Sequence, residues 1–317
     1  MIYTKRFTLL IALVLATVLL GGCGTRVADI AGGELSTRTI NVVATTGHVA
    51  DAVRNVGGDR VAVKALMGPG TDPHLYKASA SDVQALAQAD VIFYNGLHLE
   101  GRMIDIFERV SRTKPVYGIA DGVPHERLTA TGEFEGGYDP HIWFDPLLWS
   151  AAVDGVAQQL SALDAAHAST YRANAAQYKG QLAELDAYTQ ARMSSIPEGR
   201  RVLITAHDAF GYFGKRYGID VRGLQGLSTA SEAGAADVQQ LAEFIAERGI
   251  PAIFVESSVP QTTISAVQAA VRSRGQEVAI GGELFSDALG AADTPEGTYI
   301  GMVRANVDTI ANALGEG

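Results

Sequence analysis

The sequence predicts an α/β protein with two βα lobes of parallel-type sheets, one long linking α-helix and a metal site between the lobes. Short β-branched runs alternate with amphipathic stretches in both halves, which is typical of parallel βαβ units. A long helical pattern without proline separates the halves. The tripeptide Asp-Pro-His occurs at residues 72–74 and 139–141, and His207-Asp208 follows an apolar run. Proline stiffens each tripeptide, and histidine is the commonest side-chain metal ligand.

The N-terminus has the pattern of a bacterial lipoprotein signal. Two basic residues precede an apolar run at residues 7–20, which is too short for a membrane span. Small residues then lead to Cys23, the only cysteine, which has no disulfide partner. We expect residues 1–22 to be the signal peptide, Cys23 to be lipidated, and residues 23–38 to be a tether. The alternative is a buried thiol after an ordinary signal peptide.

Length favours a protein of two lobes, and charge argues against a nucleic-acid partner. Removing 22 of the 317 residues leaves 295, which is long for one core. The formal charge goes from −10 to −12, because residues 1–22 carry two basic residues and no acid. An acidic chain without a basic patch is a poor nucleic-acid binder, so no nucleic-acid partner is expected.

The N-terminal lobe is expected at residues 39–166. Its pattern predicts strands at residues 40–45, 61–66, 91–94 and 116–119, and helices at residues 48–56, 79–89, 99–110 and from about 146. Residues 121–138 are polar and turn-rich, so a loop is expected before the second Asp-Pro-His.

A linking helix is expected within residues 167–196, followed by a C-terminal lobe at residues 197–317. Apolar and aromatic residues recur at helical spacing and predict one buried face: Tyr171, Ala175, Tyr178, Leu182, Leu185 and Tyr188. The second lobe shows strand patterns at residues 201–205, 219–224, 252–256 and 277–280, and a last helix at about 298–313.

Four metal-ligating residues fall at predicted strand exits: His74, His141, His207 and Asp287. In open α/β sheets, ligands bind outside the carboxyl ends of the strands. Two of the four residues lie in each half, so a cleft between lobes would collect them. A histidine in a turn can also be satisfied locally, and an aspartate after a turn is commonly a helix N-cap.

Three imidazoles and one carboxylate suit a divalent transition metal such as zinc or manganese, and are too nitrogen-rich for calcium or magnesium. Four protein ligands would fill a tetrahedral site and leave no position for a catalytic water. The set therefore favours metal capture over catalysis, and we expect no enzyme activity. The competing hypotheses are a secreted zinc hydrolase that uses the same histidines, and a surface adhesin.

The chain from residue 40 onward resembles the cluster A-I metal-binding lipoproteins of ABC importers, the ZnuA/PsaA/TroA family, and most of all its TroA-like branch. The segments that carry the resemblance are MGPGTDPH at 67–74, YNGLHLE at 94–100, DPHIWFDP at 139–146, TAHDAFGYF at 205–213, LQG at 224–226, ESS at 256–258 and GELFSD at 282–287.

This resemblance implies an extracytoplasmic substrate-binding protein that captures one Zn²⁺ or Mn²⁺ per chain and delivers it to a membrane permease and its ATPase. The family's ligands fall here on His74, His141, His207 and Asp287. A monomer tethered to the bacterial membrane by its lipid is expected. The choice between zinc, manganese and iron stays open, as do the envelope type and the identity of the permease.

The sequence leaves the roles of one loop and three further residues open. The loop at residues 121–138 has one histidine, His125, where zinc-uptake members of the family often carry a long loop rich in histidine and acidic residues. His48 stands where the family resemblance leads us to expect an apolar residue. His98 either lies beside the metal site, serves as an alternative ligand, or is an ordinary surface or partly buried histidine. Glu256 either supports the site or caps a helix.

Overall fold

The computed structural model describes residues 35–132 and 137–315, so the expected signal segment and Cys23 lie outside the described residues. The first lobe contains a four-stranded parallel sheet in the order β2-β1-β3-β4. Its strands are β1 (Ile40–Ala44), β2 (Val61–Ala65), β3 (Val91–Tyr94) and β4 (Val116–Gly118). Its helices are α3 (Gly47–Gly57), α4 (Ala80–Gln88), α5 (Ile104–Val110) and α6 (Pro146–Leu163).

The second lobe contains two parallel strand pairs, β5-β6 and β7-β8. These strands are β5 (Val202–His207), β6 (Asp220–Gln225), β7 (Ala252–Glu256) and β8 (Ala279–Leu284). The helices are α8 (Gly211–Tyr217), α9 (Ala235–Arg248), α10 (Thr262–Ser273) and α11 (Tyr299–Gly315). The prediction of α/β lobes with parallel sheets is therefore confirmed.

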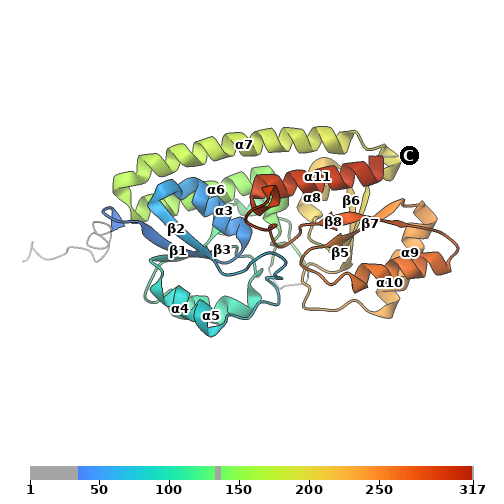
Figure 1. Ribbon diagram of the computed structural model, residues 1–317, viewed down its shortest axis with the longest axis horizontal. Coiled ribbons are helices and arrows are strands. Elements are labelled where there is room, and N and C mark those ends of the chain that lie inside the picture. Colours follow the sequence, from blue (N-terminus) through green and yellow to red (C-terminus); the bar gives the residue numbers. More distant parts are fainter. Residues whose placement is uncertain (1–34, 133–136, 316–317) are drawn as a thin grey trace, which may run out of the picture.

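Helix α7 (Ala168–Ser194) runs along one side of the molecule and spans both lobes (Figure 1). Five of the six residues predicted for its buried face are buried, whereas Tyr188 is half-buried and Thr189 and Met193 continue the face instead. This face packs on α3 and α6 of the first lobe and on α11 of the second. One buried apolar cluster accordingly extends from the first lobe beneath α7 into the second.

Local capping fixes where the helices near the lobe boundary begin. The Thr46 side chain accepts a hydrogen bond from Val49 N at the start of α3. Asp145 caps α6 by accepting from Leu147 N and Leu148 N, and Pro146 occupies the first helical position, where a missing N–H costs nothing. These caps place both helix starts directly after segments that reach the lobe boundary.

Three predicted boundaries were wrong. Strand β5 continues to His207, because Gln225 of β6 still pairs with it, so this histidine ends the strand rather than following it by two residues. Strand β8 lies later than residues 277–280, since Glu283 and Leu284 still pair with β7. The α-helix predicted from residue 99 begins only at Ile104, after a turn in which Leu97 and His98 have positive φ angles.

Candidate metal centre

His74 follows β2 in a tight loop at the lobe boundary. The Asp72 carboxylate accepts a hydrogen bond from His74 N over 2.8 Å and so closes the first Asp-Pro-His turn. Gly70, with φ of 68°, lies against the second lobe, where a Cβ at this position would sit 3.2 Å from Ser257 O. Only glycine adopts this conformation without strain. The first Asp-Pro-His is therefore a stiff turn pressed against the opposite lobe.

His141 is oriented by the aspartate of its own tripeptide. Asp139 Oδ1 accepts from His141 N over 2.9 Å and lies 2.7 Å from His141 Nδ1. Asn95 donates to Pro140 O over 3.0 Å and ties this turn to the exit of β3. Because Asp139 engages Nδ1, the Nε2 atom is the one that faces the centre of the site.

His207, at the end of β5, is held by Glu256 at the end of β7. Glu256 Oε2 lies 2.6 Å from His207 Nδ1, and Glu256 Oε1 accepts a hydrogen bond from His207 N over 2.8 Å. Both side chains are completely buried. Glu256 therefore holds both the ring and the backbone of His207, and no helix of the described residues begins at Glu256.

Asp287 lies in the loop after β8, and its backbone is fixed from both lobes. Trp143 Nε1 of the first lobe donates to Ser286 O over 3.0 Å. The Ser286 and Ser258 hydroxyls lie 2.8 Å apart. Within the described part of the chain no helix begins at Asp287, so the N-cap alternative finds no support.

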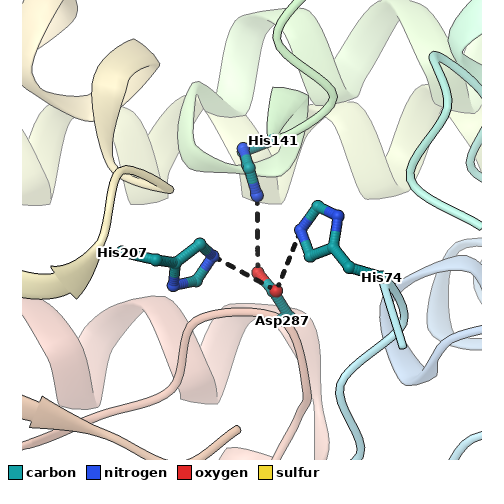
Figure 2. A group of neighbouring side chains, drawn as sticks. All are labelled: His74, His141, His207 and Asp287. Carbon is teal, nitrogen blue, oxygen red and sulfur yellow. Dashed lines mark ion pairs between the residues drawn. The ribbon is translucent and has the colours of Figure 1, made fainter. Parts of the chain in front are cut away.

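The four residues converge from three loops and the end of strand β5, two residues from each lobe (Figure 2). The Asp287 carboxylate lies 3.4 Å from His74 Nε2, 3.6 Å from His141 Nε2 and 3.2 Å from His207 Nε2. A tetrahedral zinc ion with bonds of about 2.0–2.1 Å requires neighbouring ligand atoms to be about 3.3 Å apart. The observed spacing of the carboxylate from all three imidazoles fits that requirement.

The facing atoms have no other partner among the described residues. The Nε2 atoms of the three histidines and both carboxylate oxygens of Asp287 are buried without a hydrogen-bond partner. Burying a polar atom without a partner is costly. A cluster of such atoms aimed at one point therefore fits an ion that would satisfy them together.

The carboxylates and the imidazoles of this cluster stabilise each other's charged forms. Burial alone would raise the pKa of Asp287, but the neighbouring histidines, His207 foremost, hold it well below its ordinary value. Burial alone would lower the pKa of His207, but the negative charges of Glu256 and Asp287 raise it well above its ordinary value. The aspartate is thus an anion, as a metal ligand must be.

The remaining histidines lie outside this group of four. His48 is fully buried, stacks on Trp143 at 4.8 Å, and has a pKa lowered to about 3, mainly by burial. His98 is exposed and lines a separate cavity of about 310 Å³ with Tyr94 and Tyr138. His125 packs edge-on against Tyr138, and His167 pairs with Asp164 over 2.9 Å.

The sequence alone did not predict all of the contacts that hold the segments carrying the four candidate ligands. Asp72 and Asp139 each accept a hydrogen bond from the backbone N of the histidine in their own tripeptide. The roles of Trp143, Thr229 and Tyr212, which contact the ligand-bearing segments from the opposite lobe, were not foreseen. Trp143 and Tyr212 lie inside the segments that resemble the family, but a sequence does not show which backbone atoms they reach.

Residues 42–313 match the family described as "Zinc-uptake complex component A periplasmic", ZnuA. The chain is 47% identical over 306 residues to the manganese-binding lipoprotein MntA of Bacillus subtilis, covering 96% of this chain and 98% of the relative. It is 50% identical over 273 residues to the zinc-binding protein TroA of Treponema pallidum, covering 86% of this chain and 88% of the relative.

The fold agrees with solved structures of similar proteins. The structure of the periplasmic zinc-binding protein TroA from Treponema pallidum superposes with a TM-score of 0.85 at 49% identity, covering 88% of this chain and all of that one. Fe(III)-bound YtgA from Chlamydia trachomatis superposes with a TM-score of 0.78 at 27% identity, covering 87% and 98%. Similar folds thus occur in proteins that are described with different metals.

Proposed function

The chain belongs to the ZnuA family of metal-uptake binding proteins, and from this premise we propose that it captures one divalent ion, zinc or manganese, and delivers it to an ABC permease and its ATPase. The observation that carries the proposal is the convergence of three buried Nε2 atoms and one carboxylate on a single point between the lobes. In this proposal His74, His141, His207 and Asp287 are the ligands.

The arrangement explains how capture would proceed. The neutral imidazoles bind through Nε2, and Asp287 contributes the one negative charge among the ligands. Asp139 and Glu256 lie behind His141 and His207 and keep their rings in the binding orientation. All four ligands are protein side chains, so the ion would be enclosed rather than left with an open position for substrate.

The proposal extends to the N-terminal segment outside the described residues and to the bounds of the lobes. Residues 1–22 act as the signal peptide, and Cys23 carries the lipid that anchors a monomer to the bacterial membrane outside the cytoplasm. Residues 39–166 and 197–317 form the lobes, with the linking helix at 167–196. Among the described residues no helix combines the length and apolar character of a membrane span.

Zinc is the ion that this ligand set should hold more tightly. Affinity for nitrogen and oxygen ligands rises from manganese to zinc in the usual order of divalent metals. The two similar relatives, one named for manganese and the other for zinc, are 47% and 50% identical to this chain, so overall similarity does not decide the cargo. The ion transported in the cell also depends on which ion is available there.

The hydrolase and adhesin hypotheses receive no support from the comparisons. The family and the similar relatives are binding proteins of transport systems. The enclosed four-ligand geometry also favours holding an ion over activating a water molecule.

Elemental analysis and competitive titration of the metal-free protein with zinc and manganese test the proposal. We expect one equivalent of either ion, with zinc bound more tightly. Replacing His141 by Ala should weaken zinc binding on the order of 100-fold or more, because one ligand is lost. The matched control is His125→Ala, which removes an exposed histidine outside the group. Unchanged binding in the His141 variant would refute the assignment of the site.

A further inference from the structure

The two Asp-Pro-His turns of the first lobe are each held by a hydroxyl group from the second lobe. Thr229 Oγ1 donates to Asp72 Oδ2 over 2.6 Å. Tyr212 Oη donates to Asp139 O over 3.0 Å. Both hydroxyl-bearing side chains are buried, at 7% and 2% exposure. We propose that Thr229 and Tyr212 are positioning residues that present the metal ligands of the first lobe only while the two lobes are closed. This inference rests on the proposed function.

Asp72 connects the lobe contact directly to a ligand. Its Oδ2 atom accepts from Thr229, and its Oδ1 atom accepts from His74 N over 2.8 Å. One carboxylate therefore bonds both the backbone of a ligand and the opposite lobe. Hydrogen bonds to a charged acceptor are stronger than those between neutral groups. When the lobes separate, Asp72 loses its Thr229 contact and the turn that carries His74 is freed to move.

Tyr212 holds the second tripeptide through the backbone carbonyl of Asp139 rather than through its carboxylate. It lies on α8, five residues after His207, and its hydroxyl accepts from Thr129 N over 3.0 Å while donating to Asp139 O. Burial raises the pKa of Tyr212 to about 12, so the hydroxyl keeps its proton at neutral pH and remains a donor. Asp139 in turn holds the backbone and ring of His141.

These contacts couple lobe closure to ligand placement. His207 and Asp287 belong to the second lobe, and the two hydroxyls of that lobe position His74 and His141 of the first. A complete ligand set therefore requires the lobes to be together. Separation of the lobes, for example on docking to the permease, would loosen two ligands at once and favour release of the ion.

The kinetic test measures the rate at which zinc leaves the full chain for an excess of chelator. Thr229→Val keeps the shape of the side chain and removes the hydroxyl, and we expect release about tenfold faster. Thr229→Ser restores the hydroxyl and should return the rate close to that of the wild-type protein. The matched control is Thr294→Val, which removes a hydroxyl that bonds Ala291 O within the second lobe. Equal rates for Thr229→Val and Thr294→Val would overturn the proposal.

A double-mutant test separates positioning from general stabilisation. If Thr229 acts through His74, Thr229→Val should weaken zinc binding in the wild-type and His141→Ala backgrounds but have no further effect in His74→Ala. Tyr212→Phe should show the reverse pattern, with its effect lost in His141→Ala. The same loss of affinity in every background would indicate a purely structural role and overturn the inference. A wild-type chain that binds no divalent ion would instead refute the proposed function.

Discussion

His207 Nδ1 lies 2.6 Å from Glu256 Oε2, and the backbone N of the same histidine donates to Glu256 Oε1 over 2.8 Å. One buried carboxylate thus holds both the ring and the backbone of a candidate ligand. Its charge increases the basicity of the imidazole and fixes the tautomer that directs Nε2 toward the other three candidate ligands. Asp139 holds His141 in the same way, so two of the three imidazoles are oriented by carboxylates that lie outside the group of four.

Replacing Glu256 by Gln should weaken zinc binding about 10–100-fold. The amide is neutral and offers one acceptor oxygen, so it cannot engage both His207 nitrogens as the carboxylate does. Competitive titration against a chelator of known affinity measures the loss. Glu283→Gln is the matched control, because Glu283 is exposed on the neighbouring strand β8. Equal affinities for the two variants would show that Glu256 does not tune the site.

Zinc affinity should fall as the pH is lowered, and the fall should begin above pH 6.5. The raised pKa of His207 means that the metal-free protein retains a proton there at pH values where an ordinary histidine, with pKa 6.5, has lost it. The ion must displace that proton, so the apparent affinity falls about tenfold per pH unit for each proton displaced. Calorimetry in buffers of different ionisation enthalpy would detect the released proton. Constant affinity between about pH 8 and about pH 5.5 would contradict the histidine ligands.

Zinc should stabilise the wild-type protein against unfolding. A ligand that binds only the folded state adds about 2.7 kcal/mol at a free concentration of 100 times its Kd. His141→Ala should lose most of this gain, because its affinity is lower. Thermal unfolding with and without zinc, and with a chelator, measures the difference. A similar zinc-induced shift in Tm for the wild-type protein and His141→Ala would argue that zinc binds elsewhere.

Much of the fold was predictable because its signals are local. The periodic apolar face of α7 and the β-branched runs of β1, β3 and β7 depend on neighbouring residues only. The strand ends were less predictable, because pairing decides them: β5 reaches His207 only because Gln225 lies opposite. The start of α5 was missed because Leu97 and His98 adopt positive φ angles, which sequence propensity does not predict for these residue types.

The candidate ligands were predictable for a different reason. Histidines in stiff turns at strand exits stand out in any α/β sequence, and the geometry brings His74, His141, His207 and Asp287 together. The contacts that orient them were not predictable to the same degree. Thr229 lies 157 residues from Asp72, and nothing in the local sequence of either residue indicates that they meet.

Replacing His48 by Met should raise the stability of the metal-free protein by about 1 kcal/mol or more. Both ring nitrogens of His48 are buried and lack a hydrogen-bond partner among the described residues. Methionine has a similar size, carries no strong polar group and can still pack on Trp143. Urea unfolding measures the change. Reduced stability would show that the stack of His48 on Trp143 outweighs the desolvation of its nitrogens.

Asp51 has a buried carboxyl group beneath the linking helix, and its ionisation makes the free energy of unfolding depend on pH. It accepts hydrogen bonds from Tyr178 Oη of α7 over 2.8 Å and from Asn55 Nδ2 over 3.1 Å. Burial nevertheless raises its pKa above the ordinary value, because these contacts only partly offset the loss of water. The unfolded chain, with an ordinary aspartate, therefore ionises at a lower pH than the folded protein does.

Folding stability should accordingly fall as the pH rises from the unfolded pKa of Asp51 through its raised folded pKa, and Asp51→Asn should remove this loss. Each unit by which the pKa is raised costs about 1.4 kcal/mol once the pH exceeds the folded value. Asparagine keeps an acceptor oxygen for Tyr178 and carries no charge. Urea unfolding of the metal-free proteins over a pH series should show that the variant gains stability relative to the wild-type protein as the pH rises. Parallel stability curves would mean that the Tyr178 and Asn55 contacts fully compensate the buried charge.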